Sequence, residues 1–132
     1  MRVLVDTSVW SLALRKHGPA EHPAVERLAQ LLRDGEDIFL TGTILQEILQ
    51  AFRVESTFRR MVQHFEPFPL LQVDRLDHVA AARLHRLCAQ KGVGASTIDC
   101  QIAVAAIRHG CALLSTDRDF ERMALHCELV LA

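Results

Sequence analysis

Four acidic side chains of this sequence stand shortly after apolar runs or near the beginnings of predicted helices. Asp6 directly follows the apolar run of residues 3–5, and Asp117 comes shortly after another such run. Glu47 and Asp99 lie in the first turns of two predicted helices. Carboxylate oxygens are the ligands that hard divalent cations such as Mg²⁺ and Mn²⁺ select. We therefore take these four acids as candidate metal ligands.

The four acids would be costly to bring together without a cation. Two carboxylates about 4 Å apart repel each other by roughly 4 kcal/mol at an effective dielectric constant of ~20. A divalent ion removes this cost, lowers the pKa of bound water and stabilises charge on a phosphoryl group, and two ions can clamp an in-line attack on a phosphodiester. The acids thus predict metal-dependent hydrolysis by activated water, with no histidine required as the base.

Most of these acids also have a structural alternative, which the sequence leaves open. Asp6 suits the N-cap of a helix, and Asp99 suits the last position of a capping box. Asp117 favours a helix N-terminus, and Thr116 with Asp119 fits a second capping box. Each of these roles would need no metal and no chemistry.

Glu47 fits a capping role least well. If Thr43 caps its helix, Gln46 already fills the box position and Glu47 lies one residue beyond it. Its neighbours, Ile48 among them, are typical of a core. We therefore expect the Glu47 carboxylate at the edge of the core.

Short apolar runs alternate with amphipathic segments along the chain. We predict strands at residues 2–5, 38–40, 70–73, 111–114 and 128–131. We predict helices at residues 7–16, 23–33, 55–65, 96–109 and 119–125, another that begins at Thr43, and one that is capped by Asp74 and stops at Gly92. This alternation predicts one α/β domain over residues 1–132, a five-stranded parallel sheet with helices on both faces. Ligands bind at the carboxyl ends of such strands, where all four acids fall.

Composition limits the function classes further. The chain has 132 residues, enough for one domain with a core of its own, and its net charge of -1 gives no general attraction to polyanions. The four cysteines have no C-x-x-C spacing, which favours reduced core thiols over a zinc site or disulfides. No run is long enough for a signal peptide or a membrane span. We expect a soluble, cytoplasmic protein with no membrane partner.

Four segments of the chain resemble the acidic motifs of the PIN domain family, in its VapC-type branch of bacterial toxins. The segments are Val5–Trp10, Thr43–Ile48, Ile98–Ala103 and Leu114–Phe120. The resemblance covers essentially the whole chain in order. The first and last motifs are specific together, whereas the two middle ones would be weak alone. One departure is Ser115, at a position that is usually Thr, and this change keeps the hydroxyl.

The resemblance implies a fold, an activity and partners. It implies a five-stranded parallel sheet and Mg²⁺- or Mn²⁺-dependent cleavage of a structured RNA such as a tRNA or rRNA loop. It also implies a homodimer silenced by a cognate VapB-type antitoxin. By motif, the metal ligands are Asp6, Glu47, Asp99 and Asp117. Asp119 is either a further ligand or a helix cap, and we slightly favour the cap.

Further side chains have supporting or weaker roles. Thr7 and Ser115 are expected to support the acidic site, Ser115 by hydrogen bonding. Five arginines are candidates for contact with RNA or a partner, namely Arg53, Arg59, Arg60, Arg118 and Arg122. Solvent exposure alone explains them equally well. Trp10 is assigned to core packing beside the site rather than to base stacking.

Other functions compete with the toxin nuclease. A housekeeping PIN-domain RNA-processing nuclease is the nearest, and a catalytically silent binding module on the same fold is another. A phosphorylation-controlled receiver needs a Lys after the fifth strand, and no Lys follows Lys91. A phosphohydrolase with a nucleophilic Asp needs a second Asp where Ser8 stands. The four acids and the short chain favour the toxin.

Overall fold

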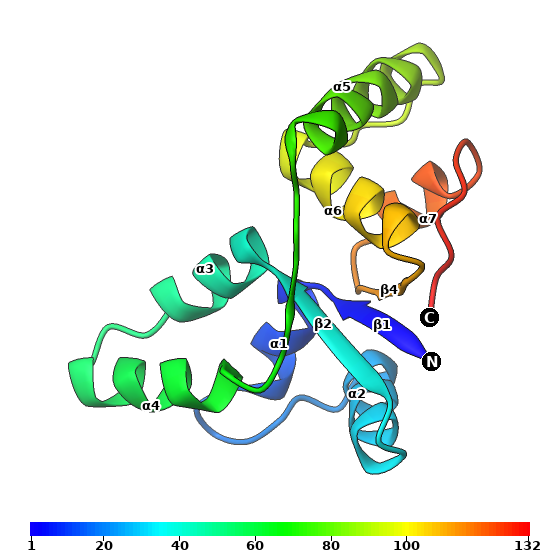
Figure 1. Cartoon of the computed structure of the whole chain (residues 1–132). Coiled ribbons are helices and arrows are strands. Elements are labelled where there is room, and N and C mark those ends of the chain that lie inside the picture. The colour runs from blue at the N-terminus through cyan, green and yellow to red at the C-terminus, as the bar shows by residue number, and fades with distance from the viewer.

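The apolar run after Met1 forms the central region of a parallel sheet in the computed structural model, which describes residues 1–132 (Figure 1). β1 (Arg2–Val5) pairs with β2 (Asp37–Thr41) on one side and with β4 (Ala112–Leu114) on the other. β3 (Leu70–Leu71) lies beyond β2, which gives the strand order β3-β2-β1-β4. All pairs are parallel, as the continuous apolar runs predict.

The sheet has four strands, so the prediction of a fifth strand at residues 128–131 is wrong. Leu131 forms only an isolated parallel bridge with Leu113. Of this segment only Leu129 is buried, at 6% exposure, whereas Val130 is 61% exposed. One inward-facing side chain does not provide the buried face that a further strand needs, and the segment pairs over a single residue.

The helices follow the predicted order. They are α1 (Thr7–Ala13), α2 (Pro23–Arg33), α3 (Gly42–Gln50), α4 (Glu55–Phe65), α5 (Arg75–Gln90), α6 (Thr97–Arg108) and α7 (Asp119–Met123). α1 and α7 end earlier than predicted. α3 begins at Gly42 rather than at Thr43, because Thr41 caps it: the Thr41 hydroxyl accepts a hydrogen bond from the backbone N–H of Ile44 at 3.1 Å.

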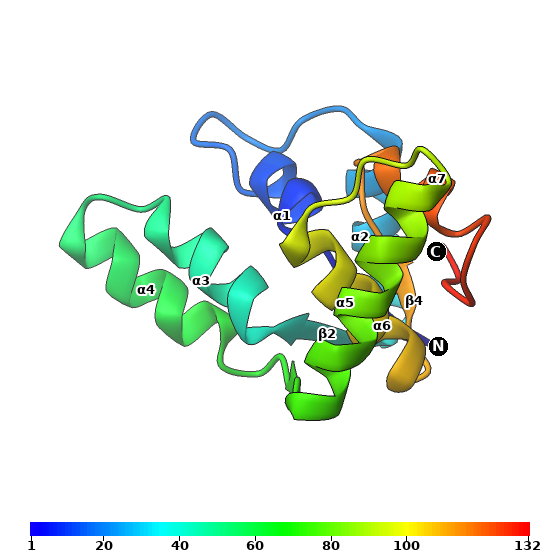
Figure 2. The same cartoon turned by 90° about the horizontal axis from the view of Figure 1, so that it is seen from above.

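The connections determine which face of the sheet each helix covers. Parallel strands are joined by right-handed crossovers, so α1 to α4 lie on one face and α5 and α6 on the other. The chain moves outward from β1 through β2 to β3 and then returns to β4, beside β1. The carboxyl ends of β1 and β4 therefore form the switch point where ligands of such sheets bind. The α3–α4 hairpin projects away from the sheet (Figures 1 and 2).

Trp10 packs in the core and joins α1 to the end of α4. It is 3% exposed and makes edge contacts with Phe65 and Phe68, at ring-centroid distances of 4.9 and 5.4 Å. This geometry confirms the core assignment of Trp10. It also fixes the α3–α4 hairpin against α1, which sets the position of Glu47 relative to Asp6.

The cysteines are all free thiols, as predicted. Cys88, Cys100 and Cys111 are buried and Cys127 is half-buried. Burial raises the pKa of the Cys100 thiol to about 11, which keeps it protonated. No helix combines the length and the apolar character that crossing a membrane requires.

Candidate active site

Asp6 lies at the switch point, and its carboxylate is held by hydroxyls rather than by the helix that follows. Its backbone N–H donates to the carbonyl of Leu114 at 2.9 Å, which continues the β1–β4 ladder. Ser8 Oγ and Ser115 Oγ both donate to Asp6 Oδ2 at 2.8 Å. Asp6 occupies the N-cap position of α1, but its side chain makes no capping bond. Asp6 is 8% exposed, and helix capping therefore does not explain its carboxylate.

Ser8 is a site residue that the sequence analysis did not identify. Besides donating to Asp6, its Oγ accepts the backbone N–H of Thr116 at 3.1 Å and lies 3.3 Å from Ser115 Oγ. Ser8 thus ties the start of α1 to the β4–α7 loop. The available signal was a hydroxyl two residues after the acid, a spacing at which local side-chain hydrogen bonds form.

Glu47 lies on α3 at the edge of the core, as expected. Thr7 Oγ1 donates to Glu47 Oε1 over a long 3.4 Å, so Thr7 contacts one of the predicted metal ligands. Burial raises the pKa of Glu47, and the carboxylates of Asp6 and Asp99 raise it further, against a smaller lowering by Thr7. Glu47 is thus held in surroundings that disfavour its charge.

Asp99 serves the helix and faces the other acids at the same time. It forms the predicted capping box of α6: its backbone N–H donates to Ser96 Oγ at 3.0 Å, and its Oδ2 accepts the Ser96 N–H at 3.3 Å. Burial raises the pKa of Asp99, and the carboxylates of Asp117 and Asp6 add to this despite the box, which lowers it. The capping role therefore does not account for all of its surroundings.

Asp117 lies on the turn that leads into α7, and Asp119 is the first residue of that helix. The backbone N–H of Asp117 donates to Ser115 Oγ at 3.1 Å, and the backbone N–H of Asp119 donates to Asp117 Oδ1 at 2.9 Å. Asp117 thus provides the local turn contact, and the capping box expected from Thr116 and Asp119 does not form. Asp119 instead pairs with Arg122 at 2.7 Å.

The five acids converge at one edge of the sheet; we call Asp6, Glu47, Asp99, Asp117 and Asp119 the acid cluster. One oxygen each from Asp99, Asp117 and Asp119 lies within 4.8 Å of the others. Oxygens on opposite sides of a Mg²⁺ ion are about 4.2 Å apart, from its ligand distance of about 2.1 Å. Small side-chain rotations would therefore bring these oxygens onto one ion.

The chemistry of the acid cluster fits a hard divalent cation. Every donor is a carboxylate oxygen, and only Asp119 forms an ion pair with a cationic side chain. The hydroxyls of Ser8 and Ser115 bind one oxygen of Asp6, which leaves Oδ1 for a ligand. Mg²⁺ and Mn²⁺ prefer such a set, whereas zinc prefers nitrogen and sulfur.

The five arginines predicted to contact RNA or a partner do not gather at one place. Arg59 pairs with Glu55 on the surface of α4, and Arg122 pairs with Asp119. Arg118 is exposed beside the acids. Arg53 and Arg60 line a separate groove instead.

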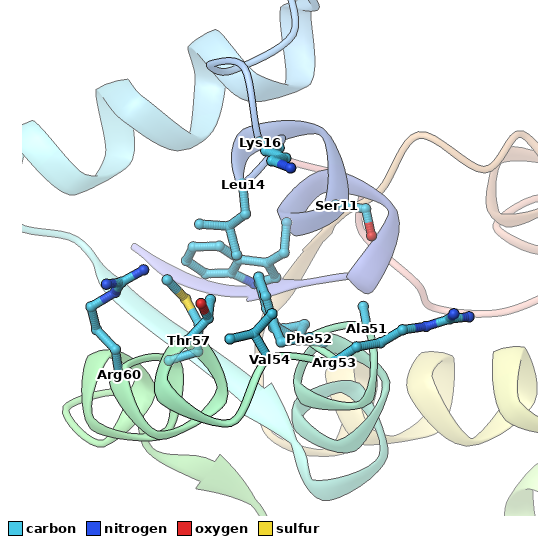
Figure 3. A pocket seen from close by; sticks show the side chains of 12 residues that line it. Ser11, Leu14, Lys16, Ala51, Phe52, Arg53, Val54, Thr57 and Arg60 are labelled. Carbon is cyan, nitrogen blue, oxygen red and sulfur yellow. The ribbon is translucent and has the colours of Figure 1, made fainter.

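This groove lies between α1 and the α3–α4 hairpin and has a volume of about 810 Å³ (Figure 3). We call it the apolar groove: its floor includes Trp10, Leu14 and Phe52, and Lys16, Arg53 and Arg60 are its charged residues. No acidic side chain lines it. The Trp10 Nε1–H is buried without a hydrogen-bond partner. The groove thus offers apolar area and positive charge.

Comparison with known proteins places these features in a family. The model of the PIN domain matches residues 3–125. The chain is 33% identical to ribonuclease VapC11 of Mycobacterium tuberculosis over 124 residues, which covers 92% of this chain and 91% of that protein. It is 28% identical to ribonuclease VapC51 of the same species, over 94% of this chain and 86% of that protein.

Solved structures show the same fold at low sequence identity. VapBC2 from Rickettsia felis, bound to a DNA fragment from its promoter, matches with a TM-score of 0.77 at 18% identity, over 100% of this chain and 98% of that one. VapC20 of Mycobacterium tuberculosis, a sarcin–ricin loop cleaving toxin, matches with a TM-score of 0.65 at 13% identity, over 91% and 93%.

Proposed function

The chain belongs to the PIN domain family, in its branch of VapC-type ribonucleases, and we propose that its acid cluster cleaves RNA with Mg²⁺ or Mn²⁺. The observation that carries the proposal is the group of acids at the β1–β4 switch point, where only Asp119 has a cationic partner. Burial and mutual repulsion raise the pKa of Glu47 and Asp99 there. A silent binding module would have no use for this destabilising arrangement.

The residues of the site have two kinds of role, holding the ion and orienting its ligands. Asp6, Glu47, Asp99 and Asp117 would hold the ion, and Asp119 would join them if Arg122 released it. When bound, the ion would act as a Lewis acid toward a phosphoryl oxygen and would lower the pKa of water, so that hydroxide is available as the nucleophile. Ser8 and Ser115 fix the direction of the Asp6 carboxylate, and Thr7 restrains Glu47. Such hydrogen bonds hold the metal ligands in a fixed orientation during the reaction.

We propose that the substrate is an exposed loop of a structured RNA, a tRNA or an rRNA. VapC20, which shares the fold, is described as cleaving the sarcin–ricin loop. The acid cluster is partly exposed at the sheet edge, with Asp117 on the surface. Loops present the unstacked strand that such an open site can reach.

We further propose that the protein is the toxin of a toxin–antitoxin pair and that a VapB-type antitoxin occupies the apolar groove. Several proteins of the same fold are VapBC complexes. The groove fits a segment with apolar anchors flanked by acidic residues, because Lys16, Arg53 and Arg60 are its only charged lining residues. The working unit is proposed to be a homodimer, the assembly that the VapC resemblance implies.

Cleavage of RNA tests the proposed function. Antitoxin-free protein would be incubated with total bacterial RNA and Mg²⁺ or Mn²⁺, with chelator in a parallel reaction. Discrete fragments are expected, and sequencing their ends identifies the target. Asp6→Asn should abolish them, whereas Asp37→Asn should not, because Asp37 is exposed at the start of β2, far from the carboxyl edge. No fragments from folded wild-type protein with either metal would contradict the proposal.

Charge reversal tests the groove. Arg60→Glu should weaken copurification of the antitoxin, and Arg59→Glu is the matched control, since Arg59 lies beside it on α4 but outside the groove. Equal retention of the antitoxin by both variants would remove the groove from the interface.

A further inference from the structure

A second groove, in which polar residues outnumber apolar ones, lies between the start of α3, the end of β3 and the paired helices α5 and α6. It consists of two adjoining cavities of about 300 and 350 Å³, which share His78 and Gln101 as lining residues. We call it the polar groove, defined by Thr43, Gln72, His78, His85, Arg86 and Gln101. The combined space is in the range of ligand-binding clefts.

The polar groove differs in charge from the rest of the surface. No Asp or Glu lines either cavity, although the chain has 16 acidic residues. Arg86 supplies a permanent positive charge, and His78 and His85 lie on the same helix. A polyanion is repelled by the carboxylates of the acid cluster. A neighbouring groove with positive charge and no acidic residues can offset this repulsion.

The hydrogen-bonding groups of the polar groove are free to bind a ligand. The six defining side chains form no hydrogen bond within the chain, whereas Thr41 at its end uses its hydroxyl to cap α3. The free groups include the two amides of Gln72 and Gln101. Amides both donate and accept, as the edges of nucleobases do.

The polar groove begins close to the acid cluster. Thr43 lies four residues before Glu47 on α3, so the two side chains are neighbours on one face, with Cβ atoms about 5–6 Å apart. Gln101 lies two residues after Asp99 on α6, about 3 Å further along the helix axis but on a different face. A strand whose phosphodiester reached the acid cluster would therefore pass the groove within its adjacent nucleotides.

We propose that the polar groove binds a ribonucleotide of the substrate strand next to the cleaved bond. Gln101, with Thr43 and His78, contacts the edge of its base, and Arg86 binds a phosphate further along the strand. The inference rests on the proposed RNA cleavage and deepens it, because it assigns sequence preference to residues outside the acid cluster. Base-edge contacts to an unpaired nucleotide are the usual source of specificity toward RNA.

Binding of a short single-stranded RNA of random sequence tests the groove, measured by fluorescence anisotropy in Ca²⁺ over a range of salt. Arg86→Ala should weaken binding and lower the slope of log Kd against log salt by about 0.7, the value for one phosphate contact on a single strand. Arg83→Ala, on the same helix but outside the groove, is its control.

Gln101→Ala should weaken binding roughly tenfold without changing the salt slope, and should alter the bases found at the ends of cleaved fragments. Gln90→Ala, exposed at the end of α5, is its control. Mn²⁺ affinity, measured by calorimetry without RNA, should stay at the wild-type value in all four variants. This readout separates the groove from the acid cluster.

Three results would overturn the inference, and they differ in what else they affect. If wild-type protein binds and cleaves RNA while both groove variants match their controls, the groove does not contact RNA and the proposed function stands. If Arg86→Ala weakens binding of an acidic antitoxin peptide but not of RNA, the groove binds the protein partner instead. If folded wild-type protein neither binds nor cleaves RNA, the inference and the proposed function fail together.

Discussion

Carboxylates gather at two places in this molecule, and α6 contributes to both. At its start, Asp99 faces the acid cluster, where only Asp119 pairs with a cationic side chain. At its end, Arg108 donates to Asp77 at 2.5 Å and to Asp74 at 3.0 Å. Asp74 and Asp77 also form the capping box of α5.

The two groups of acids also differ in the direction in which their pKa values are shifted, and this distinguishes structural acids from functional ones. Hydrogen bonds from the Asp77 backbone and from Arg108 hold the pKa of Asp74 below its ordinary value. In the acid cluster, burial and neighbouring carboxylates raise the pKa of Glu47 and Asp99. The chain thus satisfies the charge of one group and leaves that of the other for a ligand, as functional sites do.

The largest effect should come from the same substitution made in both groups. Asp99→Asn keeps the size of the side chain and an oxygen for the capping box, but it removes a charge that would hold the ion. RNA cleavage should fall roughly a thousandfold, at the upper end of the range for loss of one group that stabilises transition-state charge. Asp77→Asn should leave cleavage within about twofold of wild type. The measurement is the initial rate of cleavage of one RNA. Equal losses of rate in both variants would show that the two groups of acids do not differ in function.

The stability of these two variants should change in opposite directions when no metal is present. Asp77→Asn removes a charge-assisted hydrogen bond from a side chain that is 4% exposed, which should cost about 1–2 kcal/mol and lower the Tm by roughly 5–10 °C. Asp99→Asn removes repulsion and should raise the Tm. Thermal unfolding in chelator measures both. A lower Tm for Asp99→Asn would mean that its capping role outweighs the repulsion.

Removal of one restraint on Asp6 should have a smaller effect. Ser8→Ala takes away one of two hydroxyls on Asp6 Oδ2 and the acceptor of the Thr116 N–H. Loss of such a contact behind a metal ligand weakens metal binding about tenfold. Calorimetric titration with Mn²⁺ measures this, with Ser56→Ala on exposed α4 as the control. Unchanged Mn²⁺ affinity would show that Ser115 alone orients Asp6.

The order of elements and the place of the acids could be predicted because local signals agree with the global fold. The apolar runs around Val3–Val5 and Leu113 are buried on both sides, and the capping boxes at Asp74 and Ser96 mark helix starts unambiguously. The failure at residues 128–131 has the opposite cause. Its composition resembles a strand, but whether a strand forms depends on burial against neighbours, which the segment itself does not encode.

The partners in contacts between distant residues could not be predicted, although Ser115 was expected to support the site by hydrogen bonding. The bond from Ser115 to Asp6 and that from Ser8 to the Thr116 N–H join segments more than 100 residues apart. The polar groove is built from α3, β3, α5 and α6, so no single motif reveals it. Sequence patterns indicated the acids by their positions after strands or near helix starts, and the family resemblance indicated Thr7 and Ser115. Ser8 and the amides of the polar groove required the assembled fold.

The smallest expected effect is a difference in pH dependence between the two groups of acids. The folded-state pKa of Glu47 lies above its unfolded value of about 4.5, so its contribution to stability is present below that pH and is lost as the pH rises through the raised pKa. Glu47→Gln imitates the protonated form and should match wild type near pH 4 but have the higher Tm at pH 7, without metal. Asp74 has a lowered pKa, so its contribution is present above its unfolded value of about 3.8 and is lost as the pH falls further. Asp74→Asn should therefore have a lower Tm than wild type at pH 7 and approach the wild-type Tm below pH 3. Parallel profiles of Tm against pH for the two variants would show that the two groups of acids do not differ electrostatically.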